Sequence, residues 1–270
     1  MATDTAGDSG PSRLSIAFAL IKLTPVILMV IVLGPVHLLV MQIAPHRWTF
    51  FLPRLWHKLV LWVLGVRVHV EGEPLADGPV LLTGNHVSWL DIPILGSIAP
   101  LRFVSKDDVA DWPIIGWLIT FQKTLLVSRT RRQDTARTMA EMREALAEGD
   151  RLVLFPEGTS SDGGQVLPFR SALLGAVTGD ETSIAIQPFA LAYVRQGGLP
   201  IGRGERALLG WYGDLDLLPS FLHIIHGGVV DVAVVFGEPR TLEAMGGRKK
   251  AAPLLEADVR RSLAGRLRSG

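Results

Sequence analysis

Hydrophobic and polar positions divide the chain into three stretches. Residues 1–13 are small and polar, which is typical of a disordered tail. Residues 14–65 are rich in large apolar side chains and predict a helical, membrane-anchoring segment. Over residues 66–270, short β-like runs alternate with helical stretches, and no linker interrupts them. The pattern therefore predicts one main domain behind an anchor.

The first part of the anchoring segment has the composition of a membrane helix. Residues 14–44 are almost continuously apolar, and residues 23–42 supply the ~20 positions that a helix needs to cross a bilayer. Pro25 and Pro35 each remove a helical hydrogen bond and argue against one straight rod. A single membrane span, two short helices in one leaflet and a buried core helix all stay open.

Three tryptophans follow in a segment that is also basic. Trp48, Trp56 and Trp62 alternate with arginine, histidine and lysine, a composition that is typical of the membrane–water interface. Tryptophans also fill ordinary cores, so this interpretation has an alternative. Basic residues beside an apolar span mark its cytoplasmic side. We expect a protein attached to the inner membrane, with its main domain in the cytoplasm.

The pattern after residue 65 predicts an α/β fold. Strands are expected at residues 66–71, 80–83, 102–105, 124–128, 151–155, 184–193 and 229–236. Helices are expected at residues 89–98, 113–121, 134–148, 171–177, 217–225 and 253–267. Strands that alternate with helices usually pair in parallel. The expected fold is a mostly parallel sheet flanked by helices, with an N-terminal helical membrane anchor.

Composition and motifs exclude several classes of function. The formal net charge of +1 provides no broad field that would attract nucleic acid. The absence of cysteine excludes disulfides, thiolate metal sites and a cysteine nucleophile. The chain also lacks the G-x-S-x-G elbow, the G-x-x-x-x-G-K-[ST] phosphate loop and the H-E-x-x-H zinc helix. Because no protein nucleophile is evident, direct attack by a substrate hydroxyl is favoured over a covalent enzyme intermediate.

The first candidate site follows the strand expected at residues 80–83. His86 stands five residues before Asp91, and a histidine backed by a carboxylate can take a proton from a hydroxyl. On one regular helix the two side chains would diverge, so His86 must lie in the turn and Asp91 in the first helical turn. A Ser88 N-cap would produce that geometry. Alternatively, Asp91 only caps the helix and His86 has no chemical task.

The second candidate site follows the strand expected at residues 151–155. Residues 156–164 contain no large apolar side chain. Backbone N–H groups around Gly158 and Thr159 suit an anion or a polar headgroup, and Glu157 can accept hydrogen bonds from substrate hydroxyls. Most glycine- and serine-rich loops are only turns, so that alternative stays open.

Together the two segments resemble the lysophospholipid acyltransferase family, to which bacterial 1-acylglycerol-3-phosphate acyltransferases belong. Residues 85–91, NHVSWLD, resemble the H-x4-D motif of that family, and residues 155–159 match its F-P-E-G-T motif. Two further motifs are similar, at residues 103–106 with 112–117 and at Gln187-Pro188. The four motifs occur in the family's order over residues 66–193.

The resemblance implies an enzyme that acylates the free hydroxyl of a lysolipid, with residues 66–270 as the acyltransferase domain. His86 is then the general base and Asp91 orients it. Glu157, Gly158 and Thr159 are expected to hold the acceptor. The donor is a fatty acyl thioester of acyl carrier protein or coenzyme A, which is a co-substrate. No metal or other cofactor is implied, and the partners are the lipid acceptor, the donor and the membrane surface.

The carboxyl-terminal part resembles one subgroup, the bacterial lyso-ornithine lipid O-acyltransferases, over residues 198–239. In much of the broader family an arginine, implicated in holding the acceptor's phosphate, follows Glu-Gly-Thr. Here that position is Ser160, and Lys106 and Arg170 remain to supply positive charge. Lyso-ornithine lipid is the preferred acceptor and lysophosphatidate the alternative. An inactive membrane-binding scaffold and a lipid hydrolase are the rival hypotheses.

Overall fold

The computed structural model describes residues 13–43, 46–74, 78–107, 110, 115–127, 132–177, 184–212 and 217–269. The tail expected at residues 1–13 lies outside them except for Arg13. Residues 112–114, part of the second family-like motif, also lie outside.

Helices and strands follow one another largely in the expected order. The helices are α1 (Arg13–Ile43), η1 (His46–Phe50), α2 (Phe51–Leu64), α3 (Asp91–Ile98), α4 (Ile115–Thr120), α5 (Arg132–Ala147), η3 (Leu173–Val177), α6 (Arg203–Leu209), α7 (Leu217–His226) and α8 (Arg248–Ser269). The strands are β1 (Val66–Glu71), β2 (Val80–Gly84), β3 (Arg102–Lys106), β4 (Leu125–Val127), β5 (Arg151–Leu154), β6 (Ala185–Gln196), β7 (Leu199–Pro200), β8 (Val230–Phe236) and β9 (Arg240–Thr241). The short elements α6, β7 and β9 were not predicted.

Within the described residues the strands form one nine-stranded sheet with the order β1-β8-β6-β2-β5-β3-β4, and β7 and β9 also pair with β6. Strands β6, β2, β5, β3 and β4 are parallel to one another, as are β1 and β8. Strand β6 is antiparallel to β7, β8 and β9. The expectation of a mostly parallel sheet flanked by helices is therefore confirmed.

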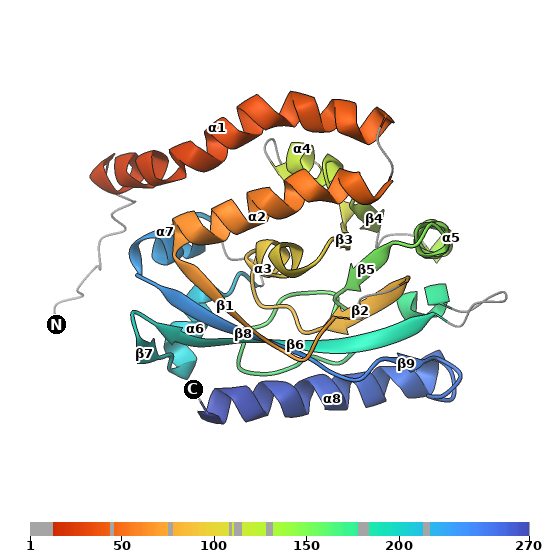
Figure 1. The fold of residues 1–270 in the computed structure, drawn as a ribbon. Coiled ribbons are helices and arrows are strands. Elements are labelled where there is room, and N and C mark those ends of the chain that lie inside the picture. Colours follow the sequence, from red (N-terminus) through yellow and green to blue (C-terminus); the bar gives the residue numbers. More distant parts are fainter. Residues whose placement is uncertain are drawn as a thin grey trace, which may run out of the picture.

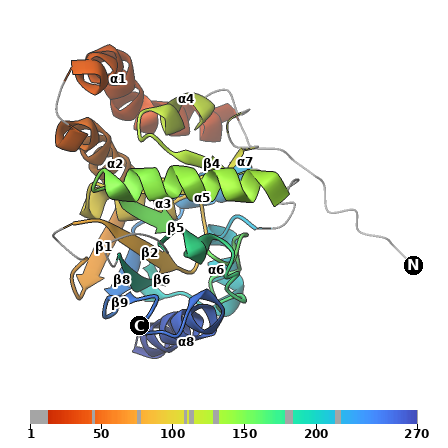
Figure 2. The same cartoon turned by 90° about the vertical axis from the view of Figure 1, so that its right-hand side faces the viewer.

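Helices cover both faces of this sheet. Helices α2 and α3 lie on one face, with α1 outermost, and α8 lies on the other face (Figure 1). Figure 2 shows α5 running across the side of the molecule near β4 and β5, which it contacts. A hydrophobic core lies on each face of the sheet, and alternate residues of β6 point into one core or the other. Phe189 and Leu191 pack on the α2 and α3 side, and Ile186 and Ala190 pack on the α8 side.

Helix α1 is continuous through Pro25 and Pro35. It is long and apolar enough to cross a membrane, and most of its large apolar side chains are exposed. It also contacts the domain. Lys22 Nζ donates a 2.9 Å hydrogen bond to the carbonyl oxygen of Ile225 in α7, and His37 Nε2 bonds a main-chain carbonyl just after α4. The exposed apolar surface of α1 indicates association with a membrane.

Helix α2 belongs to the same hydrophobic core as the sheet, although it precedes residue 65. Val60 and Leu64 are buried in that core. Two of the three tryptophans fit an interfacial belt, because Trp48 is 51% exposed and Trp62 is 75% exposed. Trp56 instead packs partly buried against the core. Helix α2 thus packs as part of the main domain, and its membership of the membrane anchor stays a prediction.

Two amino-terminal deletions should therefore behave differently. Removal of residues 1–45 takes away α1 and should leave a cooperative unfolding transition. Removal of residues 1–65 also takes away α2, whose buried apolar side chains each contribute about 1.5–3 kcal/mol. The lost core residues are Val60, Leu61, Val63 and Leu64. Their sum is comparable with the ~5–15 kcal/mol that stabilises a typical protein. Thermal unfolding followed by circular dichroism in detergent tests this, and equal melting temperatures would contradict it.

Candidate active site

The two candidate segments meet at one edge of the sheet. Strands β2, β5 and β3 are parallel neighbours, so their carboxyl ends lie at the same edge, where α/β enzymes hold their substrates. The Ser161 N–H donates a 2.8 Å hydrogen bond to the carbonyl oxygen of His86. The His86 ring also stacks on Phe155, with 4.2 Å between ring centroids. Lys106 ends β3 at this edge, and its side chain is half-buried.

Just after strand β2, the side chain of Asn85 pairs with the backbone of β6. A Cβ at Gly84 would collide with the ring and carbonyl oxygen of Phe189, which explains the glycine. The next residue, Asn85, is buried. Its Nδ2 donates to the Leu191 carbonyl at 2.9 Å, and its Oδ1 accepts from the Leu191 N–H at 2.8 Å. The amide thus satisfies the backbone of β6 and lets the chain turn away, which places His86 beyond the strand.

His86 and Asp91 form the hydrogen-bonded pair that their spacing requires. His86 Nδ1 lies 2.7 Å from Asp91 Oδ2, the His86 side chain is 21% exposed and the Asp91 side chain is fully buried. Because a carboxylate only accepts, we assign the proton to Nδ1, which leaves the lone pair of Nε2 available. No residue that the structure describes hydrogen-bonds Nε2. The pair has the geometry of a general base and its orienting carboxylate.

The predicted Ser88 N-cap is wrong. Helix α3 begins at Asp91, and the residue before it is Leu90, which makes no side-chain cap. Asp91 Oδ2 instead accepts the backbone N–H groups of Val87 at 2.7 Å and Ser88 at 3.0 Å. The first helical residue therefore holds the preceding loop, because its carboxylate can reach backward to free N–H groups.

Glu157 is buried between the two loops. Its Oε2 accepts the His86 N–H at 3.1 Å, and its Oε1 accepts the Leu167 N–H at 2.8 Å. Burial raises the pKa of Glu157 to about 8, although both hydrogen bonds oppose this shift. The nearby charges of Asp91 and Glu256 raise the pKa further. Both carboxylate oxygens thus have partners inside the protein, and the side chain ties the loops together.

The remaining predicted residues of this loop surround its sharp turn. Gly158 has a φ of 73°, in the left-handed region that favours glycine. Thr159 is exposed. Ser160 Oγ donates to the carbonyl oxygen of Trp211. The guanidinium group of Arg170 lies beside Gly158. The turn therefore presents backbone, a hydroxyl and one exposed cation.

Sequence reasoning missed Tyr193. Its hydroxyl, fully buried in β6, donates a 2.7 Å hydrogen bond to Asp91 Oδ1. Burial, with the charge of Asp91, raises the pKa of Tyr193 well above its ordinary value, so the phenol stays protonated. A tyrosine within an apolar strand is the signal that was available, because a buried hydroxyl needs a partner.

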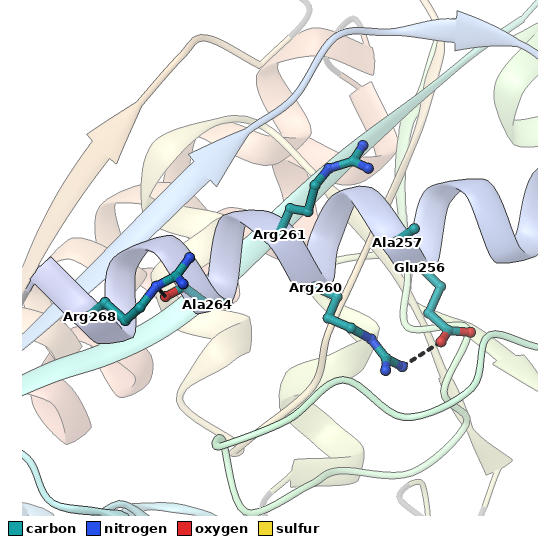
Figure 3. Close-up of a pocket in the computed structure, with 6 residues that line it drawn as sticks. All are labelled: Glu256, Ala257, Arg260, Arg261, Ala264 and Arg268. Atoms are coloured by element: carbon teal, nitrogen blue, oxygen red, sulfur yellow. Dashed lines mark hydrogen bonds and ion pairs between the residues drawn. The ribbon is translucent and has the colours of Figure 1, made fainter.

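A surface hollow lies on another part of the molecule. It is lined by six residues of α8, namely Glu256, Ala257, Arg260, Arg261, Ala264 and Arg268 (Figure 3). Helix α8 covers the face of the sheet opposite α2 and α3. Glu256 touches the second loop by accepting the Phe169 N–H at 3.1 Å. Neither His86 nor Asp91 lines this hollow, so it is separate from the candidate site at the edge of the sheet.

The chain is similar to known acyltransferases. The family model described as Acyltransferase matches residues 67–192. A lyso-ornithine lipid O-acyltransferase of Rhizobium meliloti is 39% identical over 88% of this chain and 83% of its own. A protein of the same name from Brucella abortus is 39% identical over 80% of this chain and 82% of its own.

More distant similarities are to 1-acyl-sn-glycerol-3-phosphate acyltransferases. A 1-acyl-sn-glycerol-3-phosphate acyltransferase of Neisseria meningitidis is 32% identical over 56% of this chain and 59% of its own. The crystal structure of a 1-acyl-sn-glycerophosphate acyltransferase from Thermotoga maritima has a TM-score of 0.63 at 21% identity, covering 93% of this chain and 95% of that one. This last likeness concerns the fold.

The buried carboxyl of Glu157 predicts a pH-dependent stability. Its folded-state pKa of about 8 lies above the ordinary 4.5, so the folded protein binds this proton more tightly than the unfolded chain. The stabilisation is complete below about pH 4.5 and is lost as the pH rises to about 8. Wild type should therefore lose stability over that range relative to Glu157→Gln, which cannot ionise. Urea unfolding at several pH values measures the free energy of unfolding of both proteins. The value for Glu157→Gln minus the value for wild type should rise with pH, and a difference that stays flat or falls would contradict the burial effect.

Proposed function

The chain belongs to the acyltransferase family that includes the bacterial lyso-ornithine lipid O-acyltransferases, and we propose that lyso-ornithine lipid is its acceptor. It is an enzyme that transfers a fatty acyl chain to the free hydroxyl of a lysolipid. The extent of similarity to relatives of that name supports this acceptor. Lysophosphatidate is the second candidate, because 1-acyl-sn-glycerol-3-phosphate acyltransferases of Neisseria are also similar, at lower identity and over a smaller share of the chain.

We infer that His86 is the general base. The 2.7 Å contact from Nδ1 to Asp91 carries this proposal, because it holds the proton on Nδ1 and leaves Nε2 of the partly exposed ring unprotonated. Nε2 takes the proton of the acceptor hydroxyl while the hydroxyl oxygen attacks the thioester carbonyl carbon. The carbon–sulfur bond then breaks, and the imidazolium returns the proton to the leaving thiolate. Asp91 stabilises the imidazolium between the two steps.

We propose that the second loop, residues 156–164 after β5, is the acceptor site. Thr159 is exposed and Gly158 is half-buried beside the His86 loop, so this turn is open to a headgroup. Arg170 and Lys106 would supply positive charge for a carboxylate or a phosphate. We propose that Glu157 contributes mainly by shaping this loop, since both its oxygens are hydrogen-bonded within the protein.

The donor and the membrane complete the proposal. We propose a fatty acyl thioester of acyl carrier protein or coenzyme A as co-substrate, with no further cofactor. Among the residues that the structure describes, no three His, Asp or Glu side chains lie together as metal ligands. We also propose that α1 and the exposed side of α2 hold the enzyme on the cytoplasmic face of the inner membrane, where a soluble thioester meets a lipid acceptor.

Replacement of His86 by alanine should abolish acyl transfer. General-base catalysis contributes about 10²–10⁴ in rate, and His86 is the only histidine in residues 85–91. Asp91→Asn should cause a partial loss, because the imidazole remains. Purified enzyme, labelled acyl thioester and lysolipid measure turnover, and vesicle flotation should show unchanged binding.

His69→Ala is the matched control for this experiment. His69 pairs with Asp231 at 2.8 Å in β1, and its side chain is 56% exposed. Loss of that pair should leave turnover unchanged. A His86→Ala enzyme that kept more than about a tenth of wild-type turnover would exclude His86 as the base, given the size of general-base effects.

Acceptor choice should respond to charge at Ser160. Wild type offered both lysolipids in competition should favour lyso-ornithine lipid. Ser160→Arg should shift the ratio of kcat/KM toward lysophosphatidate by roughly tenfold or more, because one charged hydrogen bond contributes about 1.5–3 kcal/mol. Ser160→Gln, long but neutral, separates charge from the loss of the contact with Trp211. An unchanged ratio in Ser160→Arg would place selectivity elsewhere, for example in residues 198–239.

A further inference from the structure

The His86–Asp91 pair has a third member on the central strand β6. Asp91 Oδ2 serves His86 and two backbone N–H groups. Its other oxygen, Oδ1, accepts from Tyr193 at 2.7 Å. Asp91 and Tyr193 are both fully buried. Among the described residues, the phenol is the hydrogen-bond donor that the structure gives to Oδ1.

The loop after β2, which holds His86, fixes where the Tyr193 hydroxyl lies relative to Asp91. Asn85 exchanges two hydrogen bonds with the backbone of Leu191. Leu191 and Tyr193 are two residues apart on β6 and therefore point to the same face of the sheet, where both pack in the core with α2 and α3. Asn85 thus sets the register between the His86 loop and β6. That register brings the Tyr193 hydroxyl to Asp91.

We propose that Tyr193 is a positioning residue for acyl transfer, which acts through Asp91 on the orientation and basicity of His86. The inference rests on the proposed role of His86 as the base. A carboxylate held at both oxygens has one orientation, and the imidazole bonded to it has one orientation and one tautomer. The phenol is neutral, so it orients the carboxylate without removing the charge that stabilises the imidazolium. Tyr193 is fully buried, so its effect on substrates is indirect.

A purely structural role makes a different prediction. A tyrosine that only fills the core would, when changed, lower stability and leave the turnover of each folded molecule unchanged. A positioning residue lowers kcat and leaves KM for both substrates near the wild-type value, because it touches neither one. The two roles therefore separate in kinetics normalised to folded enzyme.

The test is Tyr193→Phe, which removes one hydroxyl and keeps the ring. We expect kcat to fall about tenfold, a fraction of the 10²–10⁴ that a general base contributes, with both KM values unchanged. Thr138→Val, which removes one buried hydroxyl from α5 and keeps the side-chain shape, is the matched control and should retain wild-type kcat. A Tyr193→Phe enzyme with wild-type kcat per folded molecule would overturn the inference.

A second variant covers the case in which Tyr193→Phe does not fold. Asp91→Asn with Tyr193→Phe replaces the buried charge by a neutral amide, so the missing hydroxyl leaves no unpaired carboxylate. If Tyr193 acts through Asp91, this double variant should have the same kcat as Asp91→Asn alone. A further several-fold loss in the double variant would overturn the inference.

Failure of the inference is distinguishable from failure of the proposed function. Wild type and His86→Ala are measured in the same assay. If wild type does not acylate lysolipid, or if His86→Ala retains turnover, the proposed function fails. If those two results hold and Tyr193→Phe is unimpaired, only the role of Tyr193 is wrong.

Discussion

The buried carboxylate of Asp91 is the constraint on which the site depends. A fully buried charge is strongly destabilising unless hydrogen-bond donors surround it. Four donors converge on Asp91, from the His86 ring, the Val87 and Ser88 backbone and the Tyr193 hydroxyl. These donors come from the loop after β2 and from β6. Satisfying one carboxylate therefore fixes the loop, the start of α3 and the packing of the central strand at the same time.

The order of the strands brings the second loop to this carboxylate. Strands β2 and β5 are parallel neighbours although about seventy residues of chain lie between them. Residues that follow the two strands therefore meet at one edge. Glu157 turns this proximity into a fixed distance, because its two oxygens hold the backbone of His86 and of Leu167. In the proposed function, a headgroup bound by residues 156–164 would therefore lie beside His86.

Features with a local origin were predictable from the sequence, and features with a tertiary origin were not. The strands and the His86–Asp91 pair follow from periodicity and from a five-residue spacing. The N-cap of the helix that contains Asp91 was mispredicted. The Asp91 carboxylate has several N–H groups within reach, and only the fold selects among them. The hydroxyl of Tyr193 reaches Asp91 across 102 residues of sequence. No spacing rule covers such a distance.

Asp91 and Glu157 show why the role of a buried carboxylate follows from its partners. Both lie within hydrogen-bond reach of His86, but Asp91 contacts the ring and Glu157 contacts the backbone N–H. The ring changes its charge when it accepts a proton, so its partner takes part in the energetics of that step. A backbone N–H keeps the same charge throughout, so Glu157 meets the same donors before and after proton transfer. In the proposed mechanism, Asp91 therefore stabilises the charge that the ring gains, whereas Glu157 holds the backbone of the loop in place.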